Sequence, residues 1–142
     1  WFITNLTGIK TEDTWGAASF AQIAARFQAL LAGDAIFVAH NVMFDYRFLQ
    51  AEYQLLGERL HAPKACTVQL SRTFYPTEAH HRLDAVIERH GIIVEDRHRA
   101  FGDAQALVDF YGILCREFGS EVVSAAIMQQ ALKVPTSKQS LR

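Results

Sequence analysis

The chain has 142 residues, half of them apolar, which is enough for one globular domain with a single core and too few for two. Its 14 Lys and Arg nearly balance its 15 Asp and Glu, so the net charge of -1 excludes the basic excess typical of sequence-independent nucleic-acid binders. Cys66 and Cys115 lie too far apart for a C-x-x-C metal site, and no apolar run approaches the ~18 residues that span a membrane. We therefore expect a soluble protein of the reducing cytoplasm.

The first half of the chain predicts two helices around one strand. Residues 1–9 read as an apolar connection, and because they lack a starting Met we expect the chain to be cut from a longer protein. A helix then begins after Ser19, which forms a capping-box pattern with Gln22, and ends near Gly33. Residues 35–40 form a short apolar run, typical of a strand buried on both faces. A second helix is expected from residue 41 to about residue 56.

The second half predicts mostly helix. Residues 64–70 are a short strand or a strand-to-helix passage that continues to residue 75, where Pro76 ends it. Apolar spacing predicts a helix at 83–90 that stops at Gly91, a strongly amphipathic helix at 102–118, and another from about 120 to 132. Residues 135–142 are polar and contain Pro135, so they have the composition of a tail or linker.

Two carboxylates occupy corresponding positions at the starts of predicted helices. Asp103 lies four residues before Leu107 and Asp45 lies three before Phe48, so each stands at the N-terminal end of an apolar stripe. An inward carboxylate needs a partner, because burying its charge unpaired is costly. One interpretation is two unrelated helix caps, and the other is a shared site for a hard cation such as Mg²⁺ or Mn²⁺. The spacing alone leaves both open.

Residues 80–99 are rich in Arg and His. Arg82, Arg97 and Arg99 could hold phosphates or belong to a solvated surface of mixed charge. His80 and His81 are not expected to form a transition-metal pair, because adjacent residues on a helix point in different directions.

Two segments carry recognisable motifs. Residues 40–49 include His40, Asn41, Phe44 and Asp45, and residues 98–104 place His98 and Asp103 in a His-x4-Asp spacing. They resemble the second and third motifs of the DEDDh family of 3′-to-5′ exonucleases, which includes the proofreading epsilon subunit of bacterial DNA polymerase III. Residues 2–9, 66–72 and 81–83 also resemble that family, so the similarity covers about residues 1–118.

The resemblance implies an α/β chain with an RNase H-like fold, in which helices flank a mixed sheet. It implies two divalent cations, Mg²⁺ or Mn²⁺, that clamp the attacking and leaving oxygens of a phosphodiester. Asp45 and Asp103 match two of the four metal-binding carboxylates, and His98 matches the general base.

The resemblance also implies contacts with nucleic acid, most simply the 3′ end of single-stranded DNA. The substrate-binding positions implied are His40, Asn41, Phe44, Arg82 and Phe101. Exposed aromatic rings can stack on bases, although Phe44 is expected to pack in the core. A polymerase subunit or a fused second domain is the further partner expected.

One part of the family pattern is missing before His40. The D-x-E motif that supplies the other two carboxylates does not occur there, where the acids are Glu12, Asp13 and Asp34. We therefore expect residues 1–118 to be a partial exonuclease domain that lacks its N-terminal strands and is inactive by itself, followed by a C-terminal helix at 119–134 and a tail at 135–142. The strand at 35–40 should then have an exposed edge.

Two other hypotheses stay open. The first is a non-catalytic, exonuclease-like module that binds nucleic acid or a polymerase partner. The second is a helical interaction domain whose caps mimic the two motifs.

Overall fold

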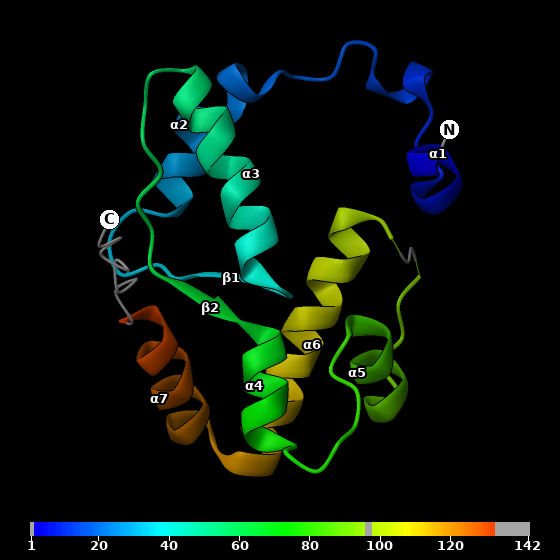
Figure 1. The fold of residues 1–142 in the computed structure, drawn as a ribbon, viewed down its shortest axis with the longest axis vertical. Helices are drawn as coiled ribbons and strands as arrows, with labels where there is room; N and C mark the ends of the chain where they lie inside the picture. Colours follow the sequence, from blue (N-terminus) through cyan, green and yellow to red (C-terminus); the bar gives the residue numbers. More distant parts are fainter. Residues whose placement is uncertain (1, 96–97, 133–142) are drawn as a thin grey trace, which may run out of the picture.

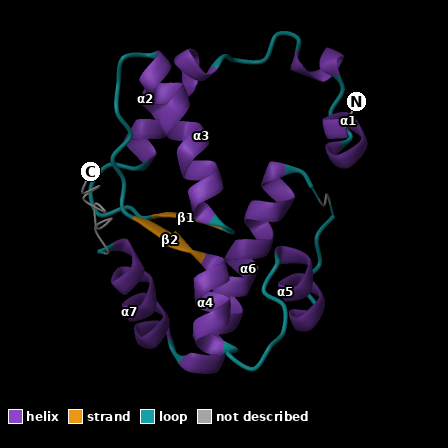
Figure 2. Ribbon diagram, viewed as in Figure 1, coloured by secondary structure: helices purple, strands orange, loops and turns teal. Residues whose placement is uncertain are grey.

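A two-stranded parallel sheet lies at the centre of the molecule. In the computed structural model, which describes residues 2–95 and 98–132, β1 (Phe37–Ala39) pairs with β2 (Lys64–Cys66) and Val38 stands opposite Ala65. Figures 1 and 2 show helices on both sides of this sheet. The predicted α/β class is confirmed, and the strand at 35–40 exists in a shorter form. The described strands make a parallel pair, and the helices that flank them are consistent with the expected RNase H-like fold.

The helices on either side of β1 in the sequence build a first core. α2 (Phe20–Leu30) begins with the predicted capping box, in which the backbone N–H of Ser19 donates to Gln22 Oε1 at 2.8 Å. α3 (Val42–Leu55) buries Tyr53, whose hydroxyl donates to the Ala24 carbonyl of α2 at 2.9 Å. This core therefore joins α2, α3 and one face of β1. Its buried members are Ala24, Tyr46, Tyr53, Leu60 and Ala62.

The N-terminal residues differ from the prediction. Residues 2–7 form a short helix, α1 (Phe2–Thr7), and a 3-10 turn follows at η1 (Thr11–Thr14), so the expected irregular connection over 1–9 is wrong. The helix ends at Gly8, whose N–H donates to the Thr4 carbonyl at 2.8 Å and whose positive φ of 70° turns the following chain away from the helix axis.

Four helices build a second core on the other side of the sheet. They are α4 (Thr67–Phe74), α5 (Leu83–His90), α6 (Ala100–Phe118) and α7 (Ser120–Ala131). Gly91 ends α5 in the left-handed conformation, as its position after the apolar stripe predicted. The side chains buried between these helices are Leu70, Val86, Phe110, Leu114 and Val123.

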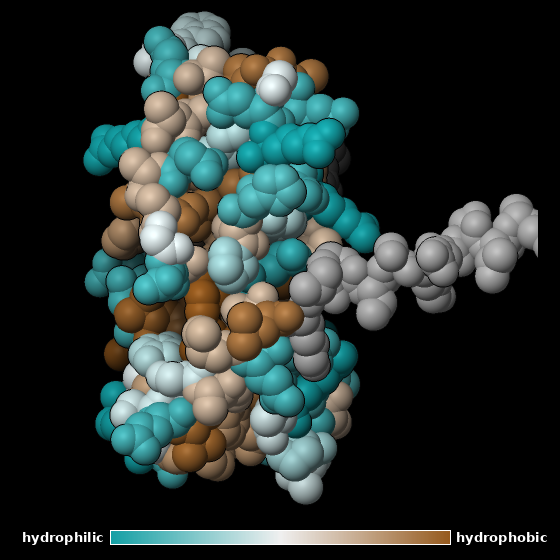
Figure 3. Space-filling model, turned by 90° about the vertical axis from the view of Figure 1, so that its left-hand side faces the viewer, coloured by the Kyte–Doolittle hydropathy of each residue, from teal (hydrophilic) through white to brown (hydrophobic). Residues whose placement is uncertain are grey.

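One face of the sheet is less covered than predicted. Phe37 of β1 packs against Phe27 and Tyr46, with ring centroids 6.5 and 6.2 Å apart, but Val38 points to the opposite face and is 39% exposed. The expectation that this strand is buried on both faces is therefore wrong. Hydrophobic side chains reach the surface in several places, as the brown patches of Figure 3 show on one side of the molecule.

No helix among the described residues is both long and apolar enough to cross a lipid bilayer. The helix expected at 119–134 is represented by α7, which Gly119 separates from α6. The predicted tail at 135–142 and Arg97 lie outside the described residues.

Candidate active site

Each of the two motifs lies at a junction between a preceding segment and a helix, and the two junctions have the same backbone arrangement. Each has a residue with left-handed backbone, Asn41 (φ 64°) or His98 (φ 66°), shortly before a helix whose first turn contains an aspartate. Among the described residues these two are the ones other than glycine with positive φ. Such a conformation costs of order 1 to 3 kcal/mol and is concentrated at functional sites. The backbone therefore marks both motif junctions independently of their side chains.

The structure places Asp45 and Asp103 in the first turns of α3 and α6, and both are half-buried. Neither carboxylate occupies the N-cap position, which is held by Asn41 in α3 and by Arg99 in α6. The interpretation of the two aspartates as N-cap residues is therefore wrong. Both retain the favourable electrostatic position of an acid near a helix N-terminus.

The described residues do not complete a metal site by themselves. Among them, no three His, Cys, Asp or Glu side chains converge closely enough to hold a metal ion. Mg²⁺ and Mn²⁺ prefer several oxygen ligands, of which Asp45 and Asp103 could supply two. A cation at these carboxylates would thus need further oxygen donors, and the role of the two aspartates as ligands stays a prediction.

His40 links the first junction to the sheet and to α4. Its Nδ1 lies 2.8 Å from Oγ1 of Thr67, the first residue of α4, and the same hydroxyl lies 3.5 Å from the carbonyl of Ala39. Thr67 is 3% exposed, so this hydrogen bond is sheltered from water. The contact holds the His40 ring beside α4, which the motif alone did not reveal. Thr67 was missed as a site residue because it lies 27 positions away in the sequence.

The two aromatic side chains that were predicted to contact the substrate, Phe44 and Phe101, lie on the surface. Phe44 is 62% exposed and packs against Phe48, one turn further along α3, with ring centroids 5.1 Å apart. The expectation that Phe44 packs in the core is therefore wrong. Phe101, at the start of α6, is 82% exposed. Both rings are accessible for stacking, and their contact with bases stays a prediction.

The basic residues of the segment before α6 have different surroundings. Arg82 is exposed at the N-cap of α5, and His98 and Arg99 are exposed just before α6. His81, in contrast, is half-buried, and its Nδ1 lies 2.8 Å from the buried Ser71 hydroxyl. The His81 ring is thus held toward α4 by its contact with Ser71.

A second half-buried histidine, His90, lies beside α6. The ring of His90 contacts Phe110 and Tyr75, at centroid distances of 5.4 and 4.8 Å. Burial lowers the pKa of His90 below its usual 6.5, an effect that Glu117 and Glu78 oppose and Arg89 reinforces. The Tyr75 hydroxyl donates a hydrogen bond to Glu117 Oε2 at 2.6 Å. Burial and this hydrogen bond raise the pKa of Tyr75, so the hydroxyl keeps its proton and remains the donor.

The lowered pKa of His90 predicts a loss of stability in acid. Because the folded state disfavours the charged imidazole, the unfolded chain takes up this proton first, and the free energy of unfolding falls as the pH drops below 6.5 toward the folded-state value. Urea unfolding at pH 7.5 and pH 5.5 should show a smaller acid loss for His90→Gln than for the unmodified protein. His61→Gln, at an exposed position, is the control. Equal acid losses in His90→Gln and the unmodified protein would contradict this assignment.

Comparison with known proteins shows to which family the chain belongs. An exonuclease family model, RNase T, matches residues 2–111, which include both motif junctions. The PolC-type DNA polymerase III of Latilactobacillus sakei is 38% identical over 106 residues, which are 74% of this chain and 7% of that protein. The PolC-type DNA polymerase III of Listeria monocytogenes is 37% identical over 103 residues, which are 72% of this chain and 7% of that protein. The PolC-type DNA polymerase III of Streptococcus suis is 34% identical over 106 residues, which are 74% of this chain and 7% of that protein.

The chain thus spans about 7% of the length of these curated relatives. The family match and the identities agree with the motif resemblance, and the family match covers the segment from α1 to the middle of α6. The chain belongs to the exonuclease family that the RNase T model describes.

Proposed function

We propose that the protein containing this chain is a 3′-to-5′ exonuclease of DNA, acting in proofreading or repair. The observation that carries the proposal is the repeated junction, in which a left-handed motif residue precedes a helix with a half-buried aspartate in its first turn. The family match supports a nuclease, and the PolC-type polymerase relatives support a role at DNA ends.

The proposed site needs divalent cations, Mg²⁺ or Mn²⁺, which Asp45 and Asp103 would hold together with oxygen ligands from outside the described residues. When bound, such ions supply charge stabilisation for phosphodiester hydrolysis. The side chains of this chain then have separable tasks. Asp45 and Asp103 provide negative charge at the two helix starts, and His40 holds the first junction against α4 through Thr67.

His98 is the proposed general base. Histidine is the side chain whose ordinary pKa lies closest to neutral pH, so it can accept a proton from an attacking water and release it again. The side chain is exposed just before α6, within five residues of Asp103. Phe44 and Phe101 are proposed to stack on bases near the 3′ end, and Asn41 and Arg82 to contact the nucleic acid.

The direction of degradation tests this proposal. The complete gene product, supplied with Mn²⁺, should shorten a single-stranded DNA oligonucleotide labelled at its 5′ end one nucleotide at a time and release 5′-mononucleotides. The same oligonucleotide with a blocked 3′ end should remain intact, because hydrolysis begins at that end. Degradation that proceeds equally from the blocked oligonucleotide, or release of a labelled 5′ nucleotide first, would contradict the 3′-to-5′ assignment.

A further inference from the structure

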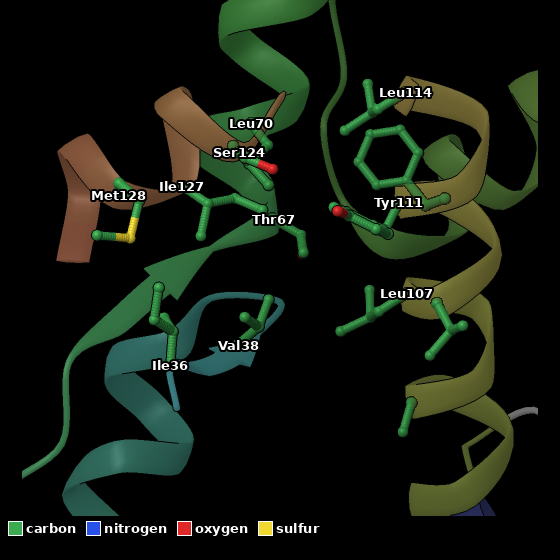
Figure 4. Close-up of a pocket in the computed structure, with 13 residues that line it drawn as sticks. Ile36, Val38, Thr67, Leu70, Leu107, Tyr111, Leu114, Ser124, Ile127 and Met128 are labelled. Atoms are coloured by element: carbon green, nitrogen blue, oxygen red, sulfur yellow. The ribbon is translucent and has the colours of Figure 1, made fainter. Parts of the chain in front are cut away.

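Two helices, α4 and α7, line hollows of opposite character. Figure 4 shows the first, an apolar groove between the sheet and α6, to which α4 contributes Leu70 and α7 contributes Ile127. The second is a polar cleft of about 460 Å³, which is lined by other faces of the same two helices and by β2. None of the described residues assigned above to the nuclease site lines this cleft. Its polar lining residues are Lys64, Cys66, Gln69, Thr73, Gln129 and Gln130.

The cleft carries a positive charge that no acid within it balances. Lys64 is the one charged side chain among the described residues that line the cleft. Its Nζ lies 4.3 Å from the centre of the Tyr46 ring, and this cation–π contact holds the ammonium group in place. A cation that is already held in place loses little further freedom when it binds a ligand. The cleft therefore favours a ligand with an anionic group.

Gln130 adds hydrogen-bond donors to the same cleft. Its Oε1 accepts a hydrogen bond from the backbone N–H of Cys66 at 2.8 Å, which fixes the carboxamide with its oxygen toward β2. The Nε2 atom of the same side chain is then left with two N–H donors for a ligand. The hydroxyl of Thr73 on α4 is a further donor in the cleft. A cation together with N–H and O–H donors binds the oxygens of a phosphate or a carboxylate.

Two further carboxamides, those of Gln69 and Gln129, extend the cleft beyond a site for phosphate alone. A carboxamide carries a donor and an acceptor side by side, the pattern that pairs with the edge of adenine. The volume of about 460 Å³ is that of a small-molecule site, so a base and a sugar fit beside a phosphate. We propose that the cleft binds an adenine nucleoside monophosphate, whose phosphate contacts Lys64 and Gln130 and whose base pairs with one of the other two carboxamides. This binding does not depend on the proposed nuclease activity.

The two cysteines of the chain make a matched pair for locating the ligand. Both are free and half-buried, but Cys66 lines the cleft and Cys115 on α6 does not. In the complete gene product, kept in EDTA and analysed by peptide mass spectrometry, saturating 5′-dAMP should slow alkylation of Cys66 by iodoacetamide at least about fivefold, because the ligand covers the thiol. Alkylation of Cys115 should not change. EDTA removes the cations that the proposed nuclease site needs, so binding there is not measured. An unchanged rate at Cys66 would overturn the proposal.

Substitutions test the phosphate contacts. Gln130→Glu keeps the oxygen that accepts the Cys66 N–H and replaces the amide donors with a second anionic oxygen, so equilibrium dialysis of labelled dAMP should show at least about tenfold weaker binding. Lys64→Gln should have an effect of similar size, and Lys64→Arg should restore most of the affinity. Gln50→Glu, exposed on α3 and outside the cleft lining, adds the same charge and should leave the affinity unchanged. Equal affinities of Gln130→Glu and Gln50→Glu would overturn the proposal.

The two halves of the ligand test its chemical class. Inorganic phosphate and deoxyadenosine should each bind at least about tenfold more weakly than dAMP, because each makes only part of the contacts. Phosphate that binds as tightly as dAMP would show a site for the anion alone and overturn the assignment of a nucleotide. Deoxyadenosine that binds as tightly as dAMP would show that the charge of Lys64 is not used and would overturn it as well.

Discussion

Replacing Asp103 with Asn is expected to lower 3′ nucleotide release by the complete gene product at least about 100-fold, because a ligand to a catalytic cation is worth several kcal/mol of transition-state stabilisation. The change removes the negative charge and keeps the size of a half-buried side chain in the first turn of α6. The fold should therefore persist while cation binding weakens. The measurement is single-turnover release from a 5′-labelled oligonucleotide across a range of Mn²⁺ concentrations, with far-ultraviolet circular dichroism to verify helix content.

The same helix provides the control. Asp109 lies six residues further along α6, is exposed, and accepts a hydrogen bond from Gln105 Nε2 at 3.3 Å. Asp109→Asn removes the same charge from the same helix, so it should change the rate by less than about twofold, as expected for a surface group. If Asp103→Asn and Asp109→Asn release nucleotides at equal rates, Asp103 is not a metal ligand.

Replacing Phe110 with Ala is expected to cause a large loss of stability. Phe110 is 1% exposed in the second core, and its ring contacts those of Tyr75 and His90. Truncating a buried Phe to Ala typically lowers the free energy of unfolding by about 3 to 5 kcal/mol, because transfer energy is lost and a cavity remains. Since single domains are stable by only about 5 to 15 kcal/mol, urea unfolding should show a much lower midpoint.

Val108→Ala, two residues earlier on α6, is the control for this effect. Val108 is 61% exposed and lines the apolar groove between the sheet and α6, so it is not part of the second core. Its truncation should change the free energy of unfolding of the 142-residue chain by about 0.5 kcal/mol or less. Equal losses for the two substitutions would contradict the orientation of α6 in the structure.

The helices followed from the sequence because their signals are local. The capping pair Ser19 and Gln22 lies within one helical turn, and Gly91 follows directly after the last turn of α5. Residues 2–7 were not predicted as a helix because six residues are too few to show a periodic pattern.

The candidate site was predictable in part. The spacing of Asp45 and Asp103 against their apolar stripes placed both in first turns, and the motif resemblance agreed with the family match. The hydrogen bond between His40 and Thr67 was not predictable, because it joins residues far apart in the sequence. The exposure of Phe44 was also missed, since an apolar side chain on a helix is buried only if another element covers it.

By itself the sequence determined where the main helices begin and end and which acids stand at their starts, because capping and periodicity depend on residues within a few positions of one another. The tertiary structure alone decided which apolar faces are covered. Phe37 is packed by α2 and α3 while its neighbour Val38 is exposed, although both are apolar residues of one strand. Coverage depends on elements distant in the sequence, and so does the left-handed backbone of Asn41 and His98, which the surrounding structure must hold against its cost.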